Sequence, residues 1–240
     1  MKKILAIILV LCTFTCCLAS CNKNDDTVTY KKNTWFTAEA LELYIGSCCD
    51  KSKMPLWKLF IKGIFAGIMI SIGGSVFLSC MGMNKIIGAC LFSVALLCIC
   101  LQGYSLYTGK IGFIVSDHSR EAVSTLLLGL LGNVIATLVF GIALGYATPS
   151  IKDAAVMICE AKLDQELPAA FIRACFCGML MYQAVSIYKN HNKNLSGIFI
   201  CIPVFILSGF EHSIANMFYF SAAGIFSFDV VIYILVVILG

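Results

Sequence analysis

The sequence has little charge, little histidine and little proline. Of its 240 residues, 12% are charged, three are histidine and four are proline, whereas 60% are hydrophobic and the mean hydropathy is +0.93. A soluble domain of this size needs a charged surface around its apolar core, which 17 basic and 13 acidic residues cannot provide. The net charge of +4 is also too small to indicate a nucleic-acid partner. The composition excludes a soluble enzyme, a nucleic-acid-binding protein and a disordered protein, and it predicts a membrane protein.

The chain also lacks the residue spacing of a metal or redox site. It has 14 cysteines but no Cys-x-x-Cys pair and no cluster of cysteine with histidine. Half of the cysteines lie inside apolar runs, where we expect them to pack as small apolar residues: Cys80, Cys90, Cys98, Cys100, Cys175, Cys177 and Cys201. The sequence therefore predicts neither a bound metal nor another cofactor.

The first 53 residues divide into three predicted segments. Residues 1–21 combine two lysines, an apolar run and the sequence Leu-Ala-Ser-Cys, a pattern typical of a lipoprotein signal with lipidation at Cys21. Residues 22–35 are polar and form a predicted tether. Residues 36–53 contain an amphipathic pattern, which predicts a short helix on a membrane face.

Long apolar segments dominate residues 54–240 and predict a multi-pass, all-α membrane domain. Four segments are each near the roughly 20 residues needed to cross the hydrocarbon of a bilayer: about 59–80, 86–107, 122–147 and 169–188. The last apolar segment, 230–240, is only about half that length. We therefore expect the last helix to be truncated, so that either the natural gene product is longer or this form is inactive.

Two polar interruptions break the apolar pattern, at 102–110 and 209–213. Irregular backbone at membrane depth is tolerated only where protein buries it or where it lines a water-filled path. The interruptions therefore predict a pore or binding site between two broken helices. Glu211 and His212 lie in the second interruption, where a charged group costs about 2.5–3.5 kcal/mol even on lenient insertion scales. Such residues are usually functional; the alternative is that His212 only caps the free backbone groups of its broken helix.

Lysines flank the predicted spans on one side. They cluster around the start of the first span and after the fourth: Lys51, Lys53, Lys58, Lys62, Lys189 and Lys193. The 148–168 link, by contrast, is net acidic. The positive-inside rule then places the start of the domain in the cytoplasm and the protein in the cytoplasmic membrane of the cell. This orientation conflicts with use of the predicted signal, which would leave residues 22–58 outside.

The second interruption also carries a family resemblance. Residues 209–218, Gly-Phe-Glu-His-Ser-Ile-Ala-Asn-Met-Phe, resemble the signature of the formate/nitrite transporter family. Further segments agree in order along residues 36–240: Pro55–Lys58, Leu106–Lys110, Gly132-Asn133 and Glu160–Leu163. The Thr-Gly-Lys sequence of the first interruption and residues 178–182 most resemble the branch that includes hydrosulfide channels. The resemblance implies a homopentamer of aquaporin-like six-helix protomers, with broken second and fifth helices.

The resemblance also implies roles for particular residues. His212 corresponds to the central pore histidine of the family and Thr108 to its partner on the loop that breaks the second helix. Asn216 corresponds to an asparagine one turn beyond the histidine, and Lys162 to a lysine of the outer vestibule. The constriction residues are Phe92 and Phe205 on the outer side and Leu96, Leu106, Tyr107 and Val185 on the inner side. Tyr182 stands where many members have a pore asparagine, which leaves the selectivity open.

Physical chemistry agrees with these roles. A bare formate or nitrite ion cannot cross an apolar constriction without a large desolvation cost, whereas its protonated form can. A vestibule lysine such as Lys162 concentrates anions, and the His212 imidazole can donate a hydrogen bond or a proton to an anion that has entered. Glu211 is expected to hold the imidazole ring or to raise its pKa, and Asn216 to face the ring from the same helix. The expected partners are small monovalent anions with protons, membrane lipid and four further copies of the chain.

The predicted function is therefore transport of formate, nitrite or hydrosulfide, without enzymatic activity. One alternative is an aquaporin-like channel for neutral solutes, although the paired Asn-Pro-Ala loops of that family are absent. A second alternative is a membrane-embedded thiol enzyme that uses the cysteines, and a third is a lipoprotein anchored at Cys21.

Overall fold

The computed structural model describes residues 55–113 and 119–240, and all secondary structure among them is helical. The long helices are α3 (Leu56–Cys80), α4 (Lys85–Gln102), α6 (Arg120–Ala147) and α8 (Leu167–Asn190). The shorter elements are α5 (Tyr107–Lys110), the 3-10 helix η1 (Ile111–Phe113), α7 (Pro149–Leu163), α9 (Ser196–Leu207), α10 (Ser213–Ala223) and α11 (Phe228–Leu239). The predicted leader with Cys21, the tether and the amphipathic 36–53 helix lie outside the described residues.

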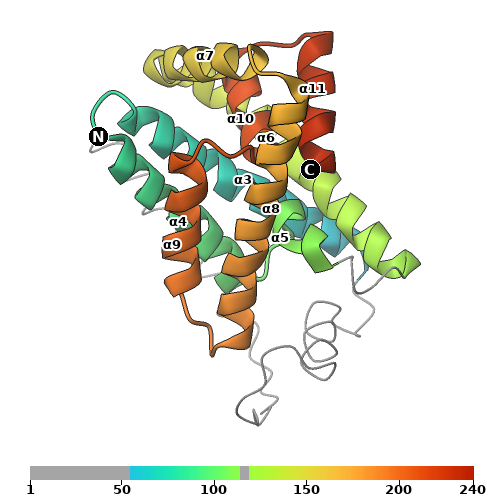
Figure 1. Cartoon of the computed structure of the whole chain (residues 1–240). Coiled ribbons are helices and arrows are strands. Elements are labelled where there is room, and N and C mark those ends of the chain that lie inside the picture. The colour runs from blue at the N-terminus through green and yellow to red at the C-terminus, as the bar shows by residue number, and fades with distance from the viewer. Residues whose placement is uncertain (1–54, 114–118) are drawn as a thin grey trace. The chain divides into compact units, whose positions relative to one another are not determined.

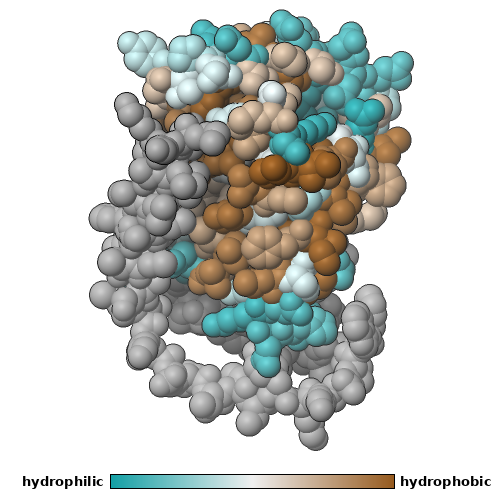
Figure 2. All heavy atoms as spheres, turned by 90° about the vertical axis from the view of Figure 1, so that its left-hand side faces the viewer, coloured by the Kyte–Doolittle hydropathy of each residue, from teal (hydrophilic) through white to brown (hydrophobic). Residues whose placement is uncertain are grey.

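Four of these helices are long enough and apolar enough to cross a membrane, and they correspond to the four predicted spans. The chain is therefore a multi-pass membrane protein. Figure 2 shows one face of the molecule, on which a hydrophobic band lies between hydrophilic ends. On α6 the exposed apolar side chains recur at helical spacing: Leu127, Leu131, Ile135, Leu138 and Ile142. Lipid or another protein surface must cover such a stripe, because water cannot solvate it favourably.

Local sequence signals explain where the helices begin and end. The Asn84 side chain accepts hydrogen bonds from the backbone N–H groups of the first turn of α4, and Ser119 and Ser227 cap α6 and α11 in the same way. The second span was expected to continue to residue 107, but α4 ends at Gln102. Gly103 adopts the left-handed conformation, with a φ of 64°, that typically ends a helix.

The 148–168 segment, expected from its sequence only to link two spans, forms the additional helix α7. Thr148 precedes it in extended conformation, and Pro149 occupies the first helical position, where its missing N–H costs nothing. In Figure 1, α7 lies across one end of the bundle, crosswise to α8 and α11. It therefore places its side chains over that end.

Helices α3 and α6 approach each other closely at glycines. A Cβ atom at Gly132 would lie 2.6 Å from the backbone oxygen of Phe60, and one at Gly63 would lie 2.7 Å from the backbone oxygen of Gly129. Small residues of this kind allow membrane helices to pack backbone against backbone, where van der Waals contact replaces the missing hydrophobic driving force. The packing of α3 against α6 supports both polar interruptions, because α6 also packs against α5, which lies in the first interruption, and against α10, which follows the second.

We expect Gly132→Ala to lower the thermal unfolding midpoint of the purified protein. The added methyl group meets backbone atoms that cannot rotate away, and overpacking of this kind typically costs about 1–3 kcal/mol. Gly82→Ala is the matched control, because a Cβ atom there has no neighbour within 4 Å. Equal unfolding midpoints for the two variants, measured in the same detergent, would contradict the predicted close contact.

Candidate functional site

The second interruption places two polar side chains inside the protein. Helix α9 ends at Leu207, Gly209 turns the chain with a φ of 70°, and α10 begins at Ser213. Glu211 and His212, between the two helices, are each only 2% exposed. The α10 helix that follows is buried along its whole length. The site is therefore held in the interior of the protomer by the packing of α10.

The hydrogen bonds of His212 define the state of its ring. Nδ1 accepts from the backbone N–H of Ala215 at 3.1 Å, and Nε2 lies 2.9 Å from Oγ1 of Thr108. An Nδ1 atom that accepts cannot carry a proton, so the ring is neutral with its proton on Nε2, which donates to Thr108. His212 is thus both the N-cap of α10 and the partner of Thr108. Of the two interpretations open from sequence, the cap is confirmed by the bond to Ala215, and the functional role of His212 stays a prediction.

The first interruption is held by a buried asparagine of α6. Asn133 donates from Nδ2 to the backbone oxygens of Gly63, at 2.7 Å, and of Ser105, at 3.0 Å. Its Oδ1 accepts from the backbone N–H of Tyr107 at 2.9 Å. The bonds to Ser105 and Tyr107 satisfy two backbone groups of the interruption, and the bond to Gly63 joins the same side chain to α3. They also position the adjacent Thr108 against His212.

Two aromatic rings extend the site on one side of His212. The ring of Phe205 stacks near the imidazole, with 5.6 Å between ring centroids, and Phe92 meets Phe205 edge to face at 6.2 Å. Both phenylalanines are buried. Leu96 lies one helical turn after Phe92 on α4 and is also buried. Phe205, with Phe92 packed against it, therefore gives the imidazole an apolar neighbour on this side, which strengthens any hydrogen bond made there.

Glu211 does not hold the imidazole ring, contrary to the expectation from sequence. Its carboxylate forms an ion pair with Lys162 of α7 and accepts from Nδ2 of Asn216 at 2.9 Å and from Nε2 of Gln165 at 3.2 Å. Asn216 therefore points to Glu211 and not to His212. The reason is that a buried carboxylate requires several donors, and the neutral ring has only one, already given to Thr108.

The hydrogen-bond network of Glu211 continues outward through Gln165. Nη1 of Arg173, an exposed residue of α8, donates to Oε1 of Gln165 at 2.7 Å. The Gln165 amide therefore has its oxygen toward the guanidinium and its nitrogen toward the carboxylate of Glu211. In the opposite orientation the amide nitrogen would face the guanidinium donor and the amide oxygen would face the carboxylate oxygen, so neither hydrogen bond could form.

The remaining predicted constriction residues lie around α5 and η1. A Cβ atom at Gly109 would lie 3.9 Å from Leu106 and 3.4 Å from Val185, so both residues are neighbours of Gly109. Tyr107 is buried, and its hydroxyl donates to the backbone oxygen of Ile238 in α11 at 3.3 Å. Tyr107 thereby ties the first interruption to the last helix.

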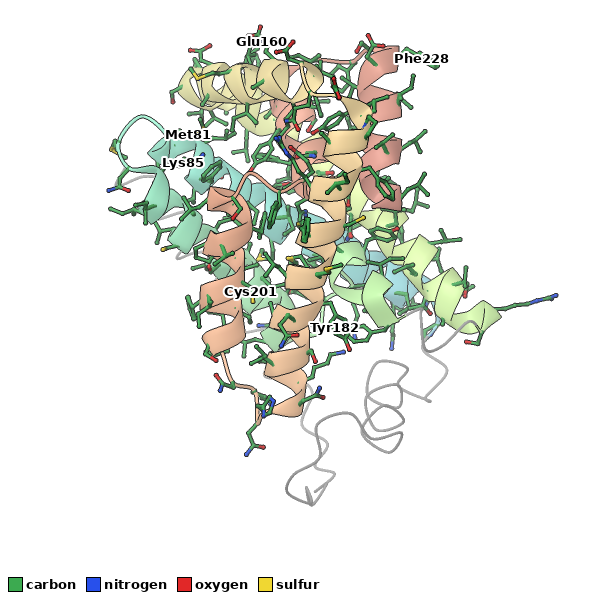
Figure 3. The ribbon with its side chains drawn as sticks, viewed as in Figure 1. Met81, Lys85, Glu160, Tyr182, Cys201 and Phe228 are labelled. Carbon is green, nitrogen blue, oxygen red and sulfur yellow. The ribbon has the colours of Figure 1, made fainter. Side chains whose placement is uncertain are left out.

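Tyr182 packs against η1. Its ring centroid lies 4.9 Å from that of Phe113, and a Cβ atom at Gly112 would approach the Tyr182 ring at 2.8 Å. Figure 3 shows Tyr182 far along α8 from the end where Glu160 projects from α7. Tyr182 thus belongs to the region of Leu106 and not to the region of Lys162.

The eight cysteines among the described residues form no disulfide with one another, and no group of three His, Cys, Asp or Glu side chains that could hold a metal occurs in that part of the chain.

Three residues of the site were absent from the set expected from sequence. Asn133 had a detectable signal, because a polar side chain inside a long apolar helix usually has a specific partner. Gln165 and Arg173 had none, since Gln165 lies in the short polar link between α7 and α8 and Arg173 in the second turn of α8, close to that link. Only the fold shows that they reach Glu211.

Comparison with known proteins shows to which family the chain belongs. The family model described as formate/nitrite transporter matches residues 38–240. The chain is 26% identical over 207 residues to the uncharacterized transporter YrhG of Bacillus subtilis, with 77% of this chain and 78% of the relative covered. It is 28% identical over 191 residues to the formate channel FocA of Escherichia coli (strain K12), with 70% and 66% covered.

Among solved structures, the chain is similar to a pentameric formate channel with formate bound. The TM-score is 0.61 at 22% identity, and the match covers 74% of this chain and 80% of that one. This similarity shows a common fold, and the family match confirms the resemblance drawn from residues 209–218. The hydrosulfide-channel branch stays a prediction. The chain belongs to the formate/nitrite transporter family.

Proposed function

We propose that this protein conducts small monovalent anions, formate or nitrite in the first place and hydrosulfide as a further candidate. The observation that carries the proposal is the buried contact between Thr108 and His212, at 2.9 Å, which joins the two helix interruptions. Family membership and the formate channel of Escherichia coli support this assignment. The family's members are transporters and channels, which favours transport over catalysis.

The geometry favours hydrogen bonding over proton donation at the histidine. His212 keeps its single ring proton on Nε2, because Nδ1 is occupied by the N–H of Ala215. When Thr108 accepts from Nε2, its own hydroxyl proton can point to an anion, so the pair offers a donor without a change of charge. The neighbouring Phe205 and Phe92 exclude water, so that this donor replaces hydration that the anion has lost.

Lys162 has a different part in this proposal from the one expected of a free vestibule lysine. It is paired with Glu211, and the two charges largely cancel at a distance. We infer that Lys162 holds the Glu211 carboxylate beside α10 and contributes only part of the attraction for an incoming anion. Asn216 and Gln165 complete the same cluster.

We further propose that the chain assembles as a pentamer. The apolar stripe on α6 offers a surface for neighbouring protomers, and the formate channel of similar fold is pentameric. Native mass spectrometry in mild detergent is expected to show five copies of the chain. A monomer as the dominant species under conditions that preserve bound lipid would contradict the proposal.

The function is tested by flux into proteoliposomes. We expect the protein to accelerate entry of formate and nitrite above the rate of empty liposomes, with hydrosulfide measured in parallel and internal pH recorded to detect accompanying protons. Glycerol and water permeability should stay at the rate of empty liposomes. Fast glycerol or water entry without anion flux would instead support a neutral-solute channel and would overturn the proposal.

A further inference from the structure

The first interruption contains a helix too short to hold its own position. Helix α5 has four residues, which is about one turn, and isolated helices of this length are not stable. Thr108 lies in this turn, 2.9 Å from Nε2 of His212. A shift of the turn by about 1 Å breaks this contact, because a hydrogen bond tolerates only a narrow range of distances. Contacts outside α5 must therefore hold Thr108 in place.

One such contact is the side-chain amide of Asn133. The residue is fully buried, its Nδ2 donates to the backbone oxygens of Gly63 and Ser105, and its Oδ1 accepts from the N–H of Tyr107. A rotated amide would put its nitrogen against the N–H of Tyr107 and its oxygen against two carbonyl groups, so only one orientation forms these bonds. Asn133 thus fixes the backbone at Ser105 and Tyr107, directly before Thr108.

Two long helices restrict the same segment. The N–H of Ser105 donates to the backbone oxygen of Lys62 in α3 at 3.1 Å. On the side of α6, a Cβ atom at Gly129 would lie only 2.7 Å from Oγ of Ser105, so α6 already approaches the segment as closely as a glycine permits. The segment before Thr108 is therefore packed against rigid helices, and Asn133 sets its register on them.

Tyr107 is held a second time, at its hydroxyl. The hydroxyl donates to the backbone oxygen of Ile238 in α11 at 3.3 Å, a long and therefore weaker hydrogen bond. A constriction at Tyr107 needs only the aromatic ring, whereas the hydroxyl reaches a different helix. The residue before Thr108 is thus tied to α6 by its backbone and to α11 by its side chain.

We propose that Asn133 and the Tyr107 hydroxyl are positioning groups for transport, which hold Thr108 at hydrogen-bond distance from His212. Neither group has to touch the permeating anion. Both N–H groups of Asn133 have acceptors and its oxygen has a donor, so its effect on flux passes through the backbone. The effect on flux rests on the proposed function, whereas the state of the His212 ring can be measured without any transport.

Three substitutions separate these contributions. Asn133→Asp keeps the acceptor for the N–H of Tyr107 but removes both N–H donors, and Tyr107→Phe keeps the ring and removes only the hydroxyl. Ser221→Ala is the matched control, because the buried Ser221 hydroxyl donates to the backbone oxygen of Thr137 in α6, at 2.8 Å, and reaches neither interruption. If Asn133→Asp is not recovered folded, Asn133→Ser takes its place in every comparison.

The nitrogen atoms of the His212 ring give the direct readout. Nitrogen NMR of the full chain with isotopically labelled histidine reports Nδ1 and Nε2 separately, and His212→Asn identifies the His212 signals among the three histidines. Thr108→Val provides the Nε2 resonance of a ring without its Thr108 partner. We expect Asn133→Asp to move the Nε2 resonance most of the way to that value, and Tyr107→Phe part of the way. The Nδ1 resonance should stay in place, because Ala215 still donates to it.

Flux into proteoliposomes tests the effect on transport. For equal amounts of folded protein, we expect Asn133→Asp to lower formate flux about tenfold and Tyr107→Phe about threefold, in line with the hydrogen bonds each removes. Ser221→Ala should keep the flux of the wild type. Added to Thr108→Val, Asn133→Asp should lower flux by less than about twofold further, because two changes that act through one contact are not additive.

The outcomes distinguish failure of the positioning from failure of the proposed function. An unchanged Nε2 resonance in the folded variants of Asn133 and Tyr107, or an equal shift in Ser221→Ala, would refute the positioning of Thr108. Fully additive losses of flux for Asn133→Asp and Thr108→Val would show that Asn133 acts by another route. If wild-type protein carries neither formate nor nitrite while the Nε2 resonance moves as expected, the proposed function fails and the positioning of Thr108 stands.

Discussion

Replacement of His212 by phenylalanine is expected to reduce formate and nitrite flux by about 10- to 100-fold. Phenylalanine keeps a planar ring beside Phe205 but has no donor for Thr108 or for an anion. Hydrogen bonds to charged groups contribute about 1.5–3 kcal/mol, and each 1.36 kcal/mol changes a rate tenfold. The measurement is initial flux into proteoliposomes that contain equal amounts of folded protein.

His212→Asn is the informative companion variant. Asparagine is a strong N-cap residue, so its side-chain oxygen can replace Nδ1 as the acceptor for the N–H of Ala215, while its amide N–H₂ faces Thr108. We expect this variant to keep the stability of the wild type and measurable flux. Asparagine does not titrate near neutral pH. The difference between the two pH profiles of flux therefore isolates the contribution of the imidazole.

Loss of a helix cap must be separated from loss of the donor. His212→Phe removes the cap of α10, at a cost of about 1 kcal/mol. Ser227→Ala removes the cap that Ser227 provides to Val230 in α11, and it should lower the unfolding midpoint to a similar extent without a loss of flux. Wild-type flux in His212→Phe would show that the histidine acts only as a cap.

The second large effect is expected at Glu211. Replacement of Glu211 by leucine leaves the Lys162 ammonium largely buried without a counter-charge and removes the acceptor of Asn216 and Gln165. Breaking a buried pair from one side typically costs about 3–5 kcal/mol. We expect the variant to unfold at a much lower temperature in detergent, or to be recovered only in small amounts.

A second substitution tests whether the cost comes from the unpaired lysine. Lys162→Met, added to Glu211→Leu, removes the stranded charge and should restore most of the lost stability. Glu160→Leu is the matched control, because Glu160 is an exposed carboxylate on the same helix as Lys162 (Figure 3); it should change the free energy of unfolding by less than about 0.5 kcal/mol. If the double variant is no more stable than Glu211→Leu, the ion pair does not explain the effect.

Much of the membrane domain could be predicted from residue order. The four spans were expected from apolar runs of near-bilayer length, and α3, α4, α6 and α8 correspond to them. The polar interruption at 102–110 marked the place where α4 ends, although the apolar span was drawn to residue 107, and the interruption at 209–213 marked the end of α9. The existence of α7 was missed. A left-handed Gly103 and a proline at the first helical position are local features that hydropathy does not detect.

The sequence predicted which residues belong to the candidate site better than it predicted which of them contact each other. The resemblance of residues 209–218 to a family signature was sufficient to select His212, Glu211 and Asn216. It was not sufficient to say which of them touch. Asn216 was expected beside the ring because it lies one turn away, but its amide turns to the carboxylate of Glu211. Burial decides this, since an ionised carboxylate needs donors more than a neutral imidazole does.

Hydropathy and local motif are properties of short segments, and membrane insertion, the long helices and the family membership follow from them. The pairs that make the site are instead distant in the chain. Thr108 and His212 are 104 residues apart, and Lys162 and Glu211 are 49 apart. They meet because glycine contacts bring α3 and α6 together, Asn133 holds the first interruption, and α7 lies across the end of the bundle. A hydrogen bond depends on distances of about 3 Å, and only the packed helices set those distances.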